Sequence, residues 1–300
     1  MQVINLNKLT KRFGHNVALD DVTYSVESGT VFALLGENGA GKTTTIRILL
    51  GLCDPDTGTS TVLDLDSQKD DLAVRRRVGY VPEQPMLYDW MSVEEIGRFA
   101  AAFYPDGFWK EYCQLTESFE LPLKTKIKSL SKGMRAKVSL SLALAHDPEL
   151  LILDEPTSGL DPLVRRSFLE SMVDRAAGGK TVFLSSHQIG EVERVADTIA
   201  IMKKSKIVLI EKLEELKSSA HVITATLSEN ARRLPDGTPD FSAPLEQVVQ
   251  TQCDHREVSI LGRYLDPAAA SVLESDQNIG RFEIRTPTLE EIFVAYMSSQ

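Results

Sequence analysis

A glycine-rich segment, GENGAGKTTT at residues 36–45, constrains the fold more than any other part of the chain. It matches the pattern G-x-x-x-x-G-K-[ST] at every fixed position, and it lies between two apolar runs, residues 31–35 and 46–50. Glycines there let backbone N–H groups converge on a phosphate, and a following helix adds the positive end of its dipole. A mere glycine-rich turn would not need this context. The segment therefore predicts a phosphate-binding loop in which Lys42 reaches the β- and γ-phosphates and the Thr43 hydroxyl binds Mg²⁺.

The composition indicates an ordinary globular protein. The 300 residues are 42% hydrophobic and 25% charged, and the net charge of -10 makes a nucleic-acid partner unexpected. The 3 cysteines are far apart and predict neither a disulfide framework nor a structural zinc site. The first residues lack a signal-peptide pattern, and no run of about 18 apolar residues occurs. We therefore expect a cytoplasmic protein that would serve a membrane only through a separate polypeptide.

Hydrophobic periodicity predicts an α/β fold with a mainly parallel sheet. Residues 3–9 and 18–26 alternate apolar and polar, which indicates an N-terminal antiparallel β subdomain with one wet face. Short apolar runs separated by helical patterns predict further strands that are buried on both faces. These runs are residues 31–35, 150–153, 181–184 and 198–202. With the phosphate-binding loop, this pattern is typical of a P-loop NTPase.

The same pattern divides the chain into two predicted domains, residues 1–218 and 219–300. A helical insert over about residues 87–146 interrupts the first domain, and Ser92-Val-Glu-Glu95 matches a capping box that would open its first helix. Segment 212–217 would be the last helix of this domain. The second domain is expected to be a small α/β domain, with strands at 221–227, 248–254, 258–264 and 281–285, helices at 267–275 and 288–297, and a loop containing Pro235, Gly237, Pro239 and Pro244.

Two adjacent carboxylates, Asp154 and Glu155, end the apolar run 150–153. The carboxyl ends of strands in open α/β sheets face the ligand crevice, so both side chains are expected near the phosphates. One carboxylate can hold Mg²⁺, directly or through water, and its neighbour can polarise an attacking water. The alternative is a pair of solvated acids at a strand end, which the apolar character of the strand disfavours.

Further motifs occur in order around these acids. Val81-Pro-Glu-Gln84 and Leu130-Ser-Lys-Gly-Met134 precede them, and Ser158-Gly-Leu-Asp161 and Ser185-Ser-His187 follow them. Together with the loop and the acid pair, these motifs resemble the nucleotide-binding subunits of ATP-binding cassette (ABC) transporters. The resemblance covers about residues 2–217, and the order of the motifs makes it specific.

The resemblance implies that the chain binds ATP and Mg²⁺. Phe13 lies where the family keeps an aromatic residue that stacks on adenine, and phenylalanine retains the stacking face. Mg²⁺ would be held by Thr43, Gln84 and Asp154. The residues that would bind the phosphates are Gly36, Glu37, Asn38, Gly39, Ala40, Gly41, Lys42, Thr43 and Thr44.

The resemblance also implies the catalytic roles. Glu155 would be the general base, and His187 would contact the γ-phosphate. Gln84 would sense both the metal and the γ-phosphate. Asp161 would belong to a loop that bridges two subunits.

The signature motif departs from the usual Leu-Ser-Gly-Gly-Gln. Ser131 and Gly133 remain and would supply a hydroxyl and a backbone N–H at a helix N-terminus, which favours anions. Lys132 adds a positive charge, and Met134 lacks the usual side-chain amide. We expect this motif to bind the γ-phosphate of a nucleotide held by the opposite subunit.

The implied assembly is therefore a head-to-tail dimer of two copies that closes around ATP and opens after hydrolysis. Its implied function is to drive export through a separate integral membrane permease, with this chain peripheral on the inner face of the cell membrane. The apolar and aromatic run at residues 85–91 would contact that permease, while packing against the insert is the alternative. The segment 286–297 resembles the tail of bacterial ABC exporter ATPases.

Two other functions stay open. One is a soluble ABC ATPase that acts on ribosomes or DNA, although such proteins usually carry two cassettes, a long coiled-coil insertion or basic patches. The other is a regulatory ATPase whose second domain binds another protein. The partner that co-purifies with the chain would distinguish these functions from transport.

Overall fold

The computed structural model divides by contacts into two compact units, Met1–Ile210 and Glu211–Gln300. It describes residues 1–157, 160, 162–228, 231 and 243–298. The division falls before residues 212–217, where the sequence pattern places the last helix of the first domain. The domain limits 1–218 and 219–300 therefore stay predictions.

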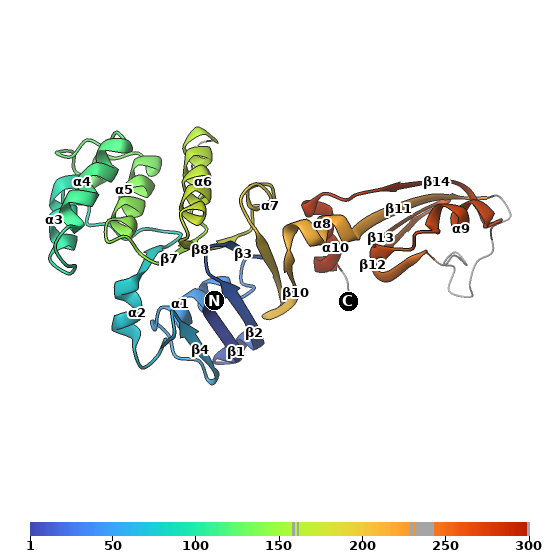
Figure 1. The fold of residues 1–300 in the computed structure, drawn as a ribbon, viewed down its shortest axis with the longest axis horizontal. Coiled ribbons are helices and arrows are strands. Elements are labelled where there is room, and N and C mark those ends of the chain that lie inside the picture. Colours follow the sequence, from blue (N-terminus) through green and yellow to red (C-terminus); the bar gives the residue numbers. More distant parts are fainter. Residues whose placement is uncertain (158–159, 161, 229–230, 232–242, 299–300) are drawn as a thin grey trace. The chain divides into compact units, whose positions relative to one another are not determined.

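A six-stranded sheet carries the predicted site and has the strand order β10-β9-β3-β8-β7-β6. Figure 1 labels β3, β7, β8 and β10 of this sheet. The pairings of β3 with β8 and β9, and of β7 with β6 and β8, are parallel. This confirms the predicted mainly parallel sheet. The strands are β3 (Val31–Gly36), β6 (Val78–Val81), β7 (Leu150–Asp154), β8 (Thr181–Ser186), β9 (Thr198–Lys203) and β10 (Lys206–Lys212).

Helices pack against this sheet and bury its central strands. Helix α1 contacts β3 and β7, and helix α6 contacts β3 and β8. Every residue of β3, β7 and β8 is buried, which explains why these strands contain continuous apolar runs rather than an alternation of apolar and polar residues. The helices that connect these strands are α1 (Lys42–Leu49), α2 (Asp71–Arg77), α6 (Pro162–Ala177) and α7 (Ile189–Val192).

The N-terminal antiparallel sheet is also confirmed, with the order β2-β1-β4-β5. Its strands are β1 (Gln2–Phe13), β2 (Asn16–Glu27), β4 (Thr57–Val62) and β5 (Leu65–Asp66). A stack of three rings joins this sheet to the parallel one. The ring of Phe32 lies 5.4 Å from that of Tyr24 on β2 and 5.6 Å from that of Phe183 on β8. The two sheets therefore share one core.

The predicted helical insert has its own N-terminal cap and its own core. Glu95 N–H donates to Ser92 Oγ (3.1 Å) and Ser92 N–H donates to Glu95 Oε2 (2.6 Å), which confirms the capping box. The hydroxyl of the fully buried Tyr112 donates to the carbonyl of Val93 (2.8 Å). The insert comprises α3 (Val93–Ala101), α4 (Phe108–Ser118), the short helix η1 (Ile127–Ser129) and α5 (Lys132–Leu144).

The second unit is the predicted small α/β domain, with an antiparallel sheet in the order β12-β13-β11-β14. Its strands are β11 (Ala220–Leu227), β12 (Leu245–Asp254), β13 (Glu257–Leu265) and β14 (Ile279–Arg285), and its helices are α8 (Leu213–Ser219), α9 (Ala269–Ser275) and α10 (Leu289–Ser298). Of the predicted loop before β12, Pro235, Gly237 and Pro239 lie outside the described residues.

A buried arginine joins the parts of this second unit. Arg263 on β13 donates from Nη2 to Glu211 Oε1 (2.5 Å) and from Nε to Ser219 Oγ (3.1 Å). Its guanidinium also lies over the ring of Tyr264, 4.7 Å from the centroid. A buried guanidinium needs a charge partner, which Glu211 supplies, and the contact with Ser219 holds the end of α8 against the sheet.

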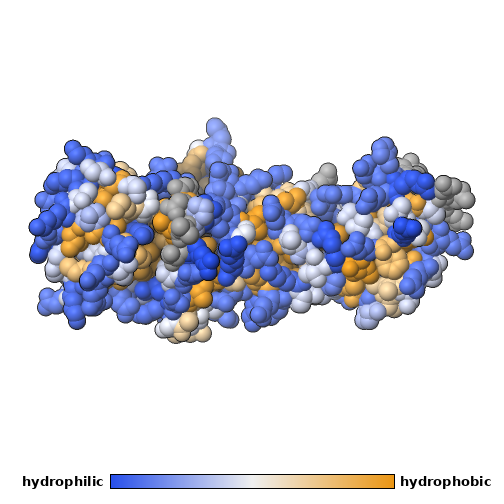
Figure 2. Space-filling model, turned by 90° about the horizontal axis from the view of Figure 1, so that it is seen from above, coloured by the Kyte–Doolittle hydropathy of each residue, from blue (hydrophilic) through white to orange (hydrophobic). Residues whose placement is uncertain are grey.

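The surface is mostly polar in the face that Figure 2 draws, with apolar patches between the polar side chains. Four exposed aromatic side chains of the first unit contact one another in a chain: Tyr88, Trp90, Phe99 and Phe103. Among the helices of the described residues, none has the length and the apolar character that a membrane crossing requires.

The core of the insert predicts a stability defect. A Cβ at Gly97 on α3 would lie 2.1 Å from the ring of Tyr112, which is fully buried and cannot swing away. We expect Gly97→Ala to lower the free energy of unfolding by about 1–3 kcal/mol. Urea unfolding followed by tryptophan fluorescence measures this, because Trp109 lies on α4 of the same insert.

A matched control is Gly190→Ala on α7, where an added Cβ meets nothing within 4 Å. We expect this change to leave stability within about 0.5 kcal/mol of wild type. An unfolding midpoint of Gly97→Ala equal to that of the control would contradict the tight packing of the insert.

Candidate functional site

The glycine-rich loop connects the end of β3 to the start of α1, as the sequence predicts. Two of its glycines have a backbone conformation that side chains disfavour, with φ of 81° at Gly39 and 116° at Gly41. A Cβ at Gly41 would also lie 2.4 Å from the carbonyl oxygen of Ala18. The loop therefore requires glycine at these positions, and this supports a backbone shaped to receive a ligand.

A pocket of about 380 Å³ opens at this loop and gathers most of the predicted nucleotide-binding residues. Gly36 and Ala40 belong to the loop but do not line the pocket. Asn16, Ala18 and Glu83 also line it, and the sequence motifs had not indicated them. The predicted residues that line it are Phe13, Glu37, Asn38, Gly39, Gly41, Lys42, Thr43, Thr44 and Glu155.

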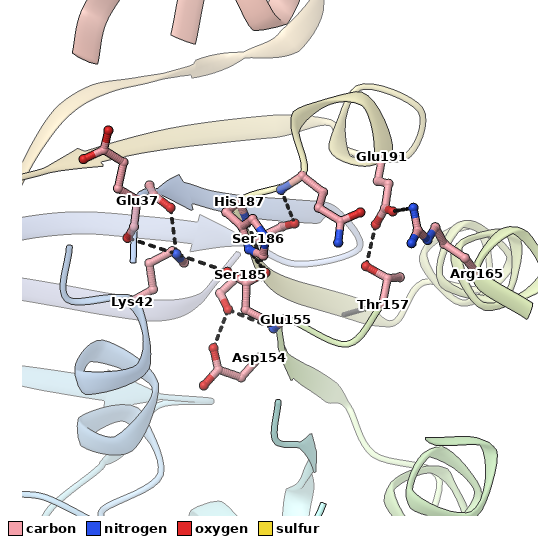
Figure 3. A network of polar contacts seen from close by, with 12 residues as sticks. Glu37, Lys42, Asp154, Glu155, Thr157, Arg165, Ser185, Ser186, His187 and Glu191 are labelled. Carbon is pink, nitrogen blue, oxygen red and sulfur yellow. Dashed lines mark hydrogen bonds and ion pairs between the residues drawn. The ribbon is translucent and has the colours of Figure 1, made fainter. Parts of the chain in front are cut away.

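Lys42 and Glu155 form a buried ion pair beside the pocket (Figure 3). Lys42 Nζ lies 3.1 Å from Glu155 Oε1, and both residues are 6% exposed. This is a charge contact rather than an aligned hydrogen bond, because Oε1 has no hydrogen-bond partner in the described part of the chain. Lys42 Nζ instead donates to the carbonyls of Gly36 (2.7 Å) and Glu37 (3.3 Å). The loop, its lysine and the acid that follows β7 are thus tied together.

Glu155 also contacts His187, which follows the end of β8. His187 Nδ1 lies 2.7 Å from Glu155 Oε2, and the His187 backbone N–H donates to the same oxygen (3.2 Å). The Glu155 backbone has φ of 47° and its N–H donates to the carbonyl of Ser185 (3.1 Å). The Glu155 carboxylate therefore lies between the Lys42 ammonium and the His187 imidazole.

Asp154 has a different partner from its neighbour. It is 2% exposed, and its Oδ1 accepts a hydrogen bond from Ser185 Oγ (2.5 Å). Ser185 lies directly opposite Asp154 in the β7–β8 pairing, and the motif at residues 185–187 did not single it out as a site residue. The only signal for Ser185 in the sequence was a polar residue at the end of a buried strand, and this does not reveal its partner.

The oxygen atoms near the loop fit a Mg²⁺ ion that the protein binds together with the phosphates of a nucleotide. The described residues contain no group of three or more histidine, cysteine, aspartate or glutamate side chains that could enclose a metal. Mg²⁺ usually keeps one or two protein ligands and completes its shell with water and substrate phosphates. The Thr43 hydroxyl, which lines the loop pocket, and the Asp154 carboxylate at the end of β7 could supply such ligands.

Gln84 does not line the loop pocket. It is exposed and lines a second pocket of about 310 Å³, together with Lys132, Arg135 and Leu160. Its neighbour Glu83 lines both pockets.

The signature residues lie apart from the loop pocket as well. Ser131 is the N-cap of α5, and its exposed Oγ accepts a hydrogen bond from Met134 N–H (3.2 Å). Neither Ser131 nor Gly133 is among the residues that line the loop pocket. Asp161, predicted to bridge two subunits, lies outside the described residues.

Comparisons with known proteins agree with this geometry. The family described as ABC transporter matches residues 19–158. The ABC transporter ATP-binding protein YxlF of Bacillus subtilis (strain 168) is 32% identical over 306 aligned residues, which cover 97% of this chain and 98% of the relative. The Nod factor export ATP-binding protein I of Bradyrhizobium diazoefficiens is 33% identical, and the alignment covers 97% of this chain and 95% of the relative.

A solved structure supports the same assignment. It is described as an ATP binding subunit of an ABC transporter, and it is 32% identical with a TM-score of 0.67. The match covers 72% of this chain and 92% of that chain. The similarity in sequence, the fold and the site geometry confirm the resemblance drawn from the motifs. The chain belongs to the family of ABC transporter ATP-binding proteins and is an ATP-hydrolysing subunit of such a transporter.

Proposed function

We propose that the chain binds MgATP in the loop pocket, closes head to tail with a second copy and drives export through a separate membrane permease. The observation that carries this proposal is that Glu155 contacts both Lys42 and His187, and that Lys42 and Glu155 line the loop pocket. These three side chains come from the loop and from the ends of two different strands, β7 and β8. The proposal needs a phosphate ligand, a general base and a contact for the γ-phosphate, and Lys42, Glu155 and His187 supply these groups close together.

The pocket residues have distinct roles in this proposal. The ring of Phe13, which is 51% exposed, offers a face for adenine. The loop N–H groups and Lys42 hold the phosphates. Thr43 and Asp154 hold Mg²⁺, which supplies charge neutralisation at the phosphates when it is bound.

Phosphate binding would also prepare the base. Lys42 Nζ contacts Glu155 Oε1, so a phosphate that takes over this ammonium releases a carboxylate oxygen. Glu155 can then accept the proton of the attacking water, while His187 keeps Oε2 oriented. Gln84 would join the site through a movement of its loop.

The position of the signature motif supports a site shared between two copies. Ser131 and Gly133 begin α5, whose N-terminus favours an anion, yet they do not line the loop pocket of their own chain. A second copy would bring its α5 to the nucleotide, and the γ-phosphate would then hold the two copies together. Asp161 would lie at the same junction.

An exposed aromatic cluster supports docking to a permease. Met86 is 96% exposed, Trp90 66% and Tyr88 49%. Beside them lies an apolar pocket of about 330 Å³ lined by Leu52, Met86 and Leu87 among others. Large apolar surface of this kind marks protein contacts. Export is the proposed direction because the relative from Bradyrhizobium diazoefficiens is named for Nod factor export.

The roles of Lys42 and His187 are separable by mutation. We expect Lys42→Ala to weaken ATP binding by about 2–5 kcal/mol, because it removes the cation that meets the phosphates. We expect His187→Ala to leave ATP binding near wild type and to lower turnover by about 100-fold or more. Calorimetric ATP titration and a phosphate-release assay measure the two effects. ATP affinity retained in Lys42→Ala, or unchanged turnover in His187→Ala, would refute the corresponding role.

Shared ATP predicts a trapped dimer. Glu155→Gln keeps the size of the side chain but removes the base, so the ATP-bound dimer should persist and elute as a dimer in size-exclusion chromatography. The double variant Lys42→Ala/Glu155→Gln is the matched control and should elute as a monomer, because it cannot hold the nucleotide. Monomer alone for Glu155→Gln, at high protein and ATP concentrations, would count against the shared site.

The permease proposal predicts a specific co-purification. The tagged full chain, extracted in mild detergent from cell membranes, should retain an integral membrane protein. Trp90→Ala should reduce its recovery, because truncating an interface tryptophan often costs about 2 kcal/mol or more. Val173→Ala removes an exposed apolar side chain on α6 and is the control. Ribosomes, DNA or a soluble protein in place of a membrane protein would favour the other functions.

A further inference from the structure

A second polar cluster lies next to the Lys42–Glu155–His187 contact and is drawn beside it in Figure 3. Glu191 Oε2 accepts a hydrogen bond from Thr157 Oγ1 (2.5 Å). Glu191 Oε1 lies 2.8 Å from Arg165 Nη1, an ion pair without hydrogen-bond alignment. Arg165 Nη2 donates to the carbonyl of Leu160 (3.1 Å). The Glu191 carboxylate and the Arg165 guanidinium thus pair with each other and hold two further groups, the Thr157 hydroxyl and the Leu160 carbonyl.

These groups come from the two chain segments that carry the site. Thr157 and Leu160 follow Glu155, while Glu191 on α7 follows His187. The two segments therefore have an inner link, from Glu155 to His187, and an outer link through Thr157 and Glu191. A second link of this kind limits how far a carboxylate and an imidazole can shift relative to each other.

The environment makes the outer link costly to remove. The side chain of Glu191 is 12% exposed, and Thr157 is 2% exposed. Loss of Glu191 would leave the Thr157 hydroxyl and the Arg165 guanidinium without their carboxylate partner. In addition, Glu155 holds a φ of 47°, a sparsely populated conformation for a residue other than glycine. Such a conformation persists only where neighbouring contacts enforce it, and the anchor at Thr157 is one of them.

We propose that Glu191 and Arg165 are positioning residues for ATP hydrolysis: they hold the segment after Glu155 against the segment after His187, so that the base and the histidine keep their contact. This inference rests on the proposed function of Glu155 and His187. The proposal gives neither residue a contact with the nucleotide, and neither lines the loop pocket. Their removal therefore acts on turnover and not on nucleotide affinity. A purely structural link between α6 and α7 would instead change stability alone.

The test measures kcat, KM for ATP, the ATP dissociation constant and the melting temperature of the full-length chain. We expect Glu191→Ala to lower kcat by about 10- to 100-fold and to leave the ATP dissociation constant unchanged. Glu191→Gln keeps an acceptor for Thr157 and loses the charge that faces Arg165, so its kcat should lie between those of Glu191→Ala and wild type. Arg165→Lys keeps the charge and loses the planar fork, and its kcat should also fall.

Arg166→Met is the matched control on the same helix. Its guanidinium pairs with Glu170 at the surface, where the two side chains are 74% and 60% exposed. We expect its kcat and ATP affinity to equal those of wild type. A drop in turnover for this control as large as that for Arg165→Lys would overturn the inference, because replacing any arginine of α6 would then have the same effect.

Two further results would overturn the inference. One is wild-type kcat in Glu191→Ala, or in Glu191→Gln if the alanine variant does not fold. The other is a loss of kcat matched by an equal loss of ATP affinity. Glu155→Gln separates this inference from the proposal on which it rests. If Glu155→Gln keeps turnover, the assignment of the base is wrong; if it loses turnover while the Glu191 variants do not, only the positioning role fails.

Discussion

The ion pair between Lys42 and Glu155 is the interaction on which the arrangement of the site depends. A buried ammonium and a buried carboxylate are each unfavourable alone and are tolerated only together. To bring them into contact, the loop after β3 and the end of β7 must lie at the same edge of the sheet. The strand order β3-β8-β7 does this and also delivers His187 between them. The parallel sheet is therefore the device that places three chemical groups from distant parts of the chain at one point.

The sequence alone was sufficient to predict those elements whose structure is determined by residues adjacent in the chain. The phosphate-binding loop could be predicted because its glycines, its lysine and its flanking apolar runs are adjacent in the chain. The buried strands could be predicted because both of their faces are covered. By contrast, β4 has the sequence TGTSTV, which lacks apolar alternation and becomes a strand through pairing with β1. Its conformation depends on a partner about fifty residues away in the chain.

The site shows the same division between local and distant causes. Asp154 and Glu155 could be predicted from their place at a strand end, but the hydroxyl partner Ser185 and the tie from Thr157 to Glu191 could not. A single serine or glutamate has no sequence pattern of its own, and its importance comes from what the fold places beside it. Gln84 and Ser131 illustrate the converse case. Gln84 was predicted at the nucleotide site but lines a separate pocket, and Ser131, predicted to serve the opposite subunit, is not among the residues that line the loop pocket.

The separate hydrophobic core of the helical insert affects how the insert can move. Its buried residues form a hydrophobic cluster of their own, distinct from the cluster that the two sheets share. Its first helix is capped by Ser92 and Glu95 and therefore does not depend on the sheets to begin. A subdomain with its own hydrophobic core can rotate as a rigid body without unfolding, since few contacts within it need to break. Strain applied at its aromatic surface would then be transmitted to the start of α5 instead of being absorbed along the way.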